Sequence, residues 1–324
     1  MEFRTRVELP AGGPRLSPRS RCLWIGSCFA EHIGCRLPRL QTAQGIPSVM
    51  VNPFGVLYNP ESIRLGLETL LENFFDEKYL FRGKDGLWHS WLHNGEFSAE
   101  EKADCLNRIL CHLQPAARLL RQTDVLFVTF GTARVYGLRD GGFVVGNCHR
   151  EPAAAFTERD LSVEEIVRTW LPLLRHLHRI NPSLQVVFTV SPYRYAKYGM
   201  HGSQLSKAAL LLSADRLVCA GGKDGLPVSH YFPAYEIILD ELRDYRFFGP
   251  DMLHPSETAI GYVWERFRDW TFTPEMHQCT EEWQRLDNAR RHRPLHPGSK
   301  NACDFRLRTE KLAQDFHTRW DSII

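Results

Sequence analysis

Two short stretches that lie far apart in the sequence contain the residue types needed for nucleophilic catalysis. Ser27 and Cys28 follow an apolar run that ends in a glycine, and Asp251 and His254 stand three positions apart near the other end of the chain. A serine or cysteine becomes an effective nucleophile when a base removes its proton and a third group orients that base. Together the two stretches contain a candidate nucleophile, base and orienting carboxylate.

Ser27 stands at a turn between a strand-like run and the helix-compatible segment 29–37. A serine at such a turn presents its hydroxyl at the edge of the sheet, where the free N–H groups of the first helical turn favour negative charge. The commoner role of a serine at this position is to cap the helix. The local sequence leaves both roles open.

Cys28 is the rival nucleophile, because a thiolate at a helix N-terminus is activated by the positive end of the helix dipole. It lies one position beyond the turn, and no Cys/His pairing elsewhere in the sequence supports it. We expect Cys28 to face inward as a small packed residue.

Asp251 and His254 precede Ser256, which has the character of a helix cap, and a helical apolar pattern follows it. Their spacing lets the carboxylate accept a hydrogen bond from one imidazole nitrogen and leaves the other nitrogen free as a base. The alternative is that Asp251 helps to start the helix and His254 is an ordinary surface residue.

Short apolar runs that end in Gly, Ser, Asn or Pro predict the buried strands that position these residues. They alternate with helical patterns such as 163–180, which is typical of a parallel sheet covered on both faces. Ligands bind beyond the carboxyl ends of the strands in such sheets. The runs are 21–27, 47–55, 124–131 and 184–192, with a fifth strand expected near 228–238.

Two regions are predicted additions to this core. Residues 61–122 form an insertion with helical patterns at 61–75 and 99–122, and its aromatic residues either stack on a sugar or, as is commoner, pack the insertion onto the sheet. Residues 271–324 form a charged, largely helical C-terminal extension of the domain 1–270. The aromatic residues of the insertion are Trp88, Trp91 and Phe97.

The composition argues against several classes of function. The 324 residues include 40 Lys and Arg against 38 Asp and Glu, a balance that does not suggest nucleic-acid binding. No apolar run is long enough to span a membrane and the N-terminus is charged, so we expect a cytoplasmic protein. The nine cysteines include no CxxC pair, and we expect neither a metal site nor a cofactor.

Seven motifs occur in order along roughly residues 3–270: GSCFAEHIG at 26–34, NPFGVLYNP at 52–60, FGTARVYG at 130–137, NCHR at 147–150, SPYR at 191–194, SQLSKAALLLSAD at 203–215 and DMLHPS at 251–256. Together they resemble the GSCFA family of the SGNH/GDSL-like hydrolase superfamily. The resemblance implies a flavodoxin-like three-layer α/β/α fold with a central parallel sheet. It implies Ser27 as the nucleophile, His254 as general base and then general acid, and Asp251 as the residue that orients His254.

The resemblance also implies an oxyanion hole. The backbone N–H groups of Ser27 and Gly55 match two of the superfamily's donors by their order along the chain. The third donor is an asparagine amide, but Ala133 stands where it is expected. Asn147 is our candidate replacement, with Asn52 and Asn59 as alternatives.

Three further motif residues are candidates for substrate binding because they lie beside strand ends. They either hold a hydroxyl or carboxylate of the substrate or tie loops together. Ser206 and Lys207 raise the idea of a Ser–Lys dyad, but they lie within a helix-like run, which favours packing or substrate binding. The three residues are His149, Arg194 and Lys207.

The resemblance implies an esterase that removes a small acyl group, acetyl being the first candidate, from a carbohydrate or related polar substrate. The same triad also serves an O-acyltransferase, since the two reactions differ mainly in how the acceptor is held. A catalytically silent module that binds a glycan or acyl carrier is a further alternative, which Ala133 leaves open. A structural assembly role would rest only on the charged tail at 271–324.

Overall fold

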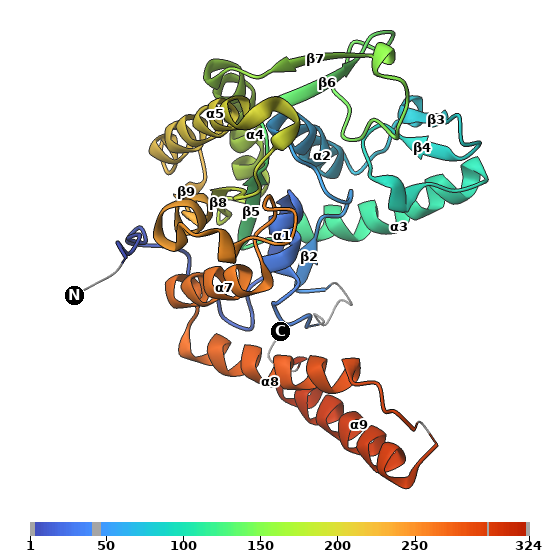
Figure 1. Cartoon of the computed structure of the whole chain (residues 1–324), viewed down its shortest axis with the longest axis vertical. Helices are drawn as coiled ribbons and strands as arrows, with labels where there is room; N and C mark the ends of the chain where they lie inside the picture. The colour runs from blue at the N-terminus through green and yellow to red at the C-terminus, as the bar shows by residue number, and fades with distance from the viewer. Residues whose placement is uncertain (1–3, 41–46, 297, 322–324) are drawn as a thin grey trace.

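A computed structural model describes residues 4–40, 47–296 and 298–321, and in this part of the chain a five-stranded parallel sheet forms the centre of the molecule (Figure 1). The five strands predicted from the apolar runs are confirmed. In spatial order they are β2 (Val49–Val51), β1 (Cys22–Gly26), β5 (Val125–Phe130), β8 (Gln185–Val190) and β9 (Val228–Tyr231).

The order of these strands determines where a site can form. Numbered in chain order among themselves, the five core strands lie in the order 2-1-3-4-5, one of the two common arrangements of doubly wound sheets. The order reverses between β1 and β5, where Gly26 pairs with Thr129. Ser27 therefore follows β1 at the position where this fold class binds its ligands.

Alternation along β1 produces a separate core on each face of the sheet. Leu23 and Ile25 join a core with α2 (Pro60–Glu72), α3 (Lys102–Leu120), α4 (Val163–Ile180) and α5 (Gly199–Ala220). Cys22 and Trp24 join the opposite core, with α1 (Cys28–Gly34), α6 (Ala234–Glu236), the π-helical turn Ile237–Leu242 and α7 (Glu257–Thr271). The predicted α/β architecture, a parallel sheet flanked by helices, is thus confirmed.

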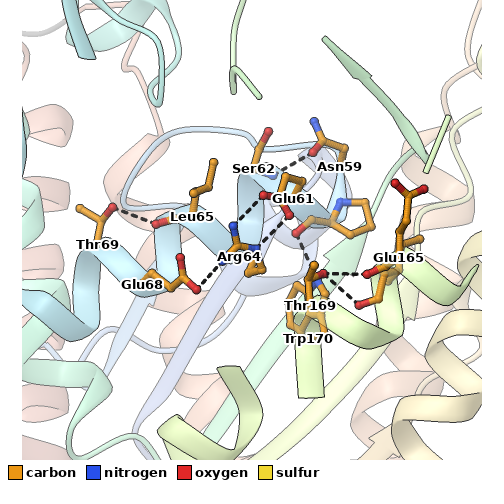
Figure 2. A network of polar contacts seen from close by, with 12 residues as sticks. Asn59, Glu61, Ser62, Arg64, Leu65, Glu68, Thr69, Glu165, Thr169 and Trp170 are labelled. Atoms are coloured by element: carbon orange, nitrogen blue, oxygen red, sulfur yellow. Dashed lines mark hydrogen bonds and ion pairs between the residues drawn. The ribbon is translucent and has the colours of Figure 1, made fainter. Parts of the chain in front are cut away.

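The N-terminus of α2 is anchored against α4, which fixes the loop that follows β2. Asn59 caps α2 by accepting a hydrogen bond from the Ser62 N–H at 2.8 Å. The buried Trp170 indole donates to the carbonyl of Pro60 at 3.2 Å, and Arg64 pairs with Glu61 (Figure 2). The far end of loop 52–59 is therefore fixed to the body of the fold.

The insertion contains a small β-hairpin in addition to its two predicted helices. β3 (Leu80–Arg82) and β4 (Trp88–Ser90) are antiparallel, and a second hairpin joins β6 (Arg134–Leu138) to β7 (Phe156–Asp160). Trp91 stacks on Phe81 with ring centroids 3.5 Å apart, and Phe97 is buried. These contacts support the packing interpretation of the aromatic residues rather than sugar stacking.

The C-terminal extension forms two helices that project from the body beyond α7 (Figure 1). α8 (Pro274–Arg291) and α9 (Lys300–Trp320) pack on each other, and the Trp320 indole donates to Glu282 at 2.7 Å. A small hydrophobic core, separate from the two cores of the sheet, joins both helices to the segment after α1. It consists of Leu40, Cys279, Leu286, Phe316 and Trp320. None of the helices in the described residues is both long and apolar enough to cross a membrane.

Candidate active site

Ser27 stands directly after β1 in a tightly packed turn. Gly26 has a φ of +139°, and a Cβ there would lie 2.2 Å from the carbonyl oxygen of Thr129, so glycine is required before the serine. The Ser27 N–H donates to the same carbonyl at 3.1 Å. The Ser27 hydroxyl accepts a hydrogen bond from the Phe29 N–H at 3.3 Å and so caps α1. The residue is 1% exposed.

Asp251 and His254 form the predicted pair on the loop before α7. Asp251 Oδ2 lies 2.5 Å from His254 Nδ1, and Oδ1 accepts hydrogen bonds from the N–H groups of Leu253 and His254 at 2.9 and 3.0 Å. The hydrogen bonds from His254 hold the pKa of Asp251 well below its ordinary range. The ionised carboxylate keeps the imidazole proton on Nδ1, which leaves Nε2 with a basic lone pair.

A cavity of about 20 Å³, enough for a single water molecule, joins the start of α1 to His254. The Tyr193 ring packs against His254 with centroids 4.2 Å apart. Among the described residues no hydrogen bond joins the Ser27 hydroxyl to His254. Such bonds are often long without substrate and tighten in the reactive complex. The cavity is lined by Cys28, Phe29, His32, Ser191, Pro192, Tyr193, His254, Pro255 and Ile260.

A comparison with family models assigns the chain to a family. The model described as the GSCFA family matches residues 21–267. The chain belongs to the GSCFA family. The match begins one residue before β1 and ends within α7, so it includes Ser27, Asp251 and His254 and leaves out α8 and α9. Comparisons with curated proteins and with solved structures give no match.

Cys28 lies differently in this GSCFA protein from what its sequence predicts. The expectation that it packs inward is wrong, because it is half-buried and lines the cavity beside His254. The inward face of α1 consists of Phe29, Ala30 and Ile33 instead. Burial, with a further contribution from the Glu31 carboxylate, raises the pKa of the Cys28 thiol. The thiol is therefore neutral at physiological pH and a poor nucleophile.

Both predicted backbone donors of the oxyanion hole have partners here. The Ser27 N–H donates to Thr129, and the Gly55 N–H donates to the carbonyl of Asn52 at 2.8 Å. Gly55 has a φ of +73°, and the Asn94 side chain lies 2.2 Å from the place of a Cβ. These N–H groups stabilise an oxyanion only if they leave their present acceptors, so their catalytic role stays a prediction.

Among the described residues, Asn52 provides an amide donor without a hydrogen-bond partner beside the Gly26–Ser27 turn. Its Oδ1 accepts a hydrogen bond from the Gly26 N–H at 2.9 Å, and its backbone is left-handed with a φ of 46°. Its Nδ2 is buried and makes no hydrogen bond within the described chain. A buried unpaired donor costs stability, which makes this amide the better-placed candidate for an oxyanion donor. From the sequence it is only an alternative to Asn147.

Asn147 and His149 bond to each other and to the β3–β4 hairpin rather than to Ser27 within the described residues. Asn147 Oδ1 accepts from the His149 N–H at 2.8 Å, and His149 Nε2 lies 2.9 Å from the carbonyl oxygen of Ser90 in the β3–β4 hairpin. Burial lowers the pKa of His149. In the described residues, neither makes a hydrogen bond or ring contact with Ser27, Asp251 or His254.

Arg194 supports the loop that carries His254. Its N–H donates to the carbonyl of Leu253 at 3.2 Å, and its guanidinium donates to the carbonyl of Met252 at 3.0 Å. These contacts favour loop positioning, the second of the two roles expected from the sequence. Substrate binding by Arg194 stays a prediction.

The Ser206–Lys207 dipeptide does not form a dyad. Ser206 Oγ accepts a hydrogen bond from the Ala133 N–H at 2.7 Å and lies 3.1 Å from Thr132 Oγ1. Lys207 Nζ donates instead to two backbone carbonyls. The dipeptide therefore holds the loop after β5, and Ala133 is fully buried within that loop.

Three tyrosines around the site are not singled out by the sequence. Tyr193 contacts His254, and Tyr195 packs edge-on against both Tyr193 and Tyr58.

Within the described ranges, no group of three or more His, Cys, Asp or Glu residues is arranged to hold a metal ion.

Proposed function

We propose that this GSCFA protein is a serine hydrolase of the SGNH/GDSL type. It removes a small acyl group, such as acetyl, from a carbohydrate or a related polar substrate. One observation carries the proposal: His254, which is paired with Asp251, lines the same cavity as Cys28, the residue directly after Ser27. That cavity lies at the carboxyl ends of the parallel strands, where such folds place their chemistry.

The proposed reaction uses each member of the triad in turn. The Ser27 hydroxyl attacks the ester carbonyl while His254 Nε2 accepts its proton, and Asp251 stabilises the imidazolium that forms. The tetrahedral intermediate collapses when His254 returns the proton to the leaving alcohol. Water then attacks the acyl-enzyme with His254 again as base, which releases the acid and restores Ser27.

Asn52 Nδ2 is the proposed amide donor to the oxyanion. It meets the main requirement for such a group, because it is fixed by its own Oδ1 and is free to donate. The N–H groups of Ser27 and Gly55 complete the proposed hole after exchanging their present acceptors for the oxyanion.

The proposed superfamily placement rests on the strand order 2-1-3-4-5, which is that of flavodoxin-like sheets, together with the position of the serine after the first strand.

An O-acyltransferase would use the same residues with a sugar in place of water. The burial and capping role of Ser27 favour one other candidate, a silent module that binds an acylated glycan.

Hydrolysis of chromogenic acetyl, butyryl and octanoyl esters tests the proposal. We expect the wild type to prefer acetyl, Ser27→Ala to lose activity and Cys28→Ala to keep it. A Ser27→Ala variant as active as the wild type would show that the proposal is wrong. A folded wild type that cleaves none of the esters, but binds an acetylated oligosaccharide as tightly as Ser27→Ala does, would support the silent module.

A further inference from the structure

Lys207 is a buried cation at the catalytic edge of the sheet. It lies on α5, which packs against β8 and β9 (Figure 1). The residue is 2% exposed. Its Nζ donates to the carbonyls of Gly131 and Ser191, each at 2.6 Å. These residues directly follow β5 and β8, so one ammonium group joins the carboxyl ends of two neighbouring strands.

The charge of Lys207 has no carboxylate partner in the described part of the chain. Its surroundings are the two carbonyls and the ring faces of Tyr195 and Tyr235, each 5.9 Å from Nζ. The titratable groups that face it are Cys28 of α1 and these two tyrosines. Burial raises the pKa of all three, so they stay neutral near pH 7 and supply no counter-charge.

The two carbonyls belong to backbone segments that flank the proposed reactants. A Cβ on Gly131 would lie 3.4 Å from the Ser27 Cβ, so the loop after β5 runs directly against the serine. Ser191 lines the cavity beside His254. The Gly131 N–H donates to the carbonyl of Tyr58 at 2.7 Å, so hydrogen bonds hold Gly131 at both its N–H and its carbonyl. Lys207 therefore connects the backbone next to the nucleophile with the backbone next to the base.

We propose that protonated Lys207 is a positioning residue of the active site. It fixes the ends of β5 and β8 relative to each other and keeps their carbonyl oxygens turned onto its ammonium group, away from the charge that develops on the substrate oxyanion. The expected effect of Lys207 on catalysis rests on the proposed function. Its hydrogen bonds to the two backbone carbonyls do not depend on that function. This role differs from the direct substrate contact expected from the sequence.

The protonation state of Lys207 gives the role a pH signature. Burial lowers the pKa of Lys207 to about 7, so the ammonium is present below neutral pH and is lost as the pH rises. A neutral amine keeps two N–H donors but loses the charge, and charge-assisted hydrogen bonds are roughly twice as strong as neutral ones. Activity should therefore rise with pH as a histidine base loses its proton and fall again above neutral pH as Lys207 loses its own.

The test compares Lys207→Met, Lys207→Gln and Lys207→Arg with the wild type. Lys197→Met is the matched control, because Lys197 is an exposed lysine that donates to Tyr136 outside the triad. Amide hydrogen exchange over residues 129–133 and 190–193 reads the hold on the backbone without any need for activity. We expect exchange there to be about tenfold faster or more in Lys207→Met and unchanged in Lys197→Met.

The kinetic readout is kcat, KM and the pH profile with an acetyl ester. We expect Lys207→Met to lower kcat by about 10²-fold with little change in KM and to remove the fall above neutral pH. Lys207→Arg should keep more activity than Lys207→Gln, because it keeps the charge. If Lys207→Met does not fold, this Arg and Gln pair carries the same comparison through exchange and kinetics.

Two results would overturn the inference. One is unchanged exchange at both strand ends in a folded variant without the charge. The other is a raised KM with an unaltered kcat, which would assign Lys207 to substrate binding. A wild type that neither cleaves esters nor reacts at Ser27 defeats the proposed function instead, while the exchange comparison still decides whether Lys207 holds the backbone.

Discussion

The two parts of the proposed triad lie in very different surroundings. Ser27 is buried, its N–H is bonded across the sheet to Thr129, and its hydroxyl caps a helix. Asp251 and His254 have side chains about half exposed, on a loop that includes the left-handed residue Met252. The proposed nucleophile is thus fixed by the sheet, whereas the proposed base depends on local contacts of a surface loop.

This difference indicates which substitutions should change the proposed reaction most. Main-chain pairing across the sheet determines the position of Ser27, so substitution of its hydroxyl should change the reaction far more than the fold. The position of His254 depends on Asp251 and on the two carbonyls held by Arg194. Substitutions around the loop should therefore have graded effects.

Removal of the nucleophile should have the largest effect. We expect Ser27→Ala to lower kcat by about 10³-fold or more, because no other hydroxyl replaces it. The lost cap should cost about 1 kcal/mol in the free energy of unfolding, measured by denaturant titration. Cys28→Ala is the matched control and should keep most of the activity, and activity lost in Cys28→Ala alone would reverse the assignment.

Removal of the base should be almost as severe. We expect His254→Ala to lower kcat by about 10³-fold, and the double variant with Ser27→Ala to lose little more, since triad members act as a unit. The comparison needs steady-state rates of both single variants and the double variant. Losses that multiply in the double variant would show that His254 does not act on Ser27.

Loss of the amide donor should have a smaller effect. Asn52→Asp keeps the oxygen that accepts from the Gly26 N–H and removes the Nδ2 donor, so we expect kcat to fall by about 10²-fold. Asn147→Asp makes the same chemical change in the β3–β4 neighbourhood and should change kcat less than twofold. A larger loss in Asn147→Asp than in Asn52→Asp would return Asn147 to the oxyanion hole.

Loosening of the loop should have the smallest effect. Arg194→Ala removes the guanidinium bond to Met252 but leaves the backbone bond to Leu253, so we expect kcat to fall about fivefold, the equivalent of about 1 kcal/mol. The measurement is kcat and KM with an uncharged acetyl ester. A raised KM for acidic substrates alone would favour the substrate-binding role instead.

The sequence predicts the central sheet because its strands are continuous apolar runs, which only burial on both faces explains. It does not predict the β3–β4 and β6–β7 hairpins, because their strands lack continuous runs of buried apolar residues, as in Phe156–Asp160, where only Phe156 is buried. Patterns of hydrophobicity contain little information about such strands.

The candidate site divides in a similar way. The contact between Asp251 and His254 follows from local spacing, and the position of Ser27 follows from the strand before it. The choice between Asn52 and Asn147 does not follow from the sequence, because it depends on which amide finds partners in the folded chain. The exposure of Cys28 depends on the face of a short helix, and the bonds of Lys207 join segments far apart in sequence.

Labelling with a fluorophosphonate, followed by peptide mapping, tests the central claim most directly, because it needs neither the natural acyl group nor an acceptor. We expect one adduct on Ser27 in the wild type, the same adduct in Cys28→Ala, slower labelling in His254→Ala and none in Ser27→Ala. A folded wild type that leaves Ser27 unmodified, or that carries the adduct on Cys28, would contradict the assignment of Ser27 as the nucleophile.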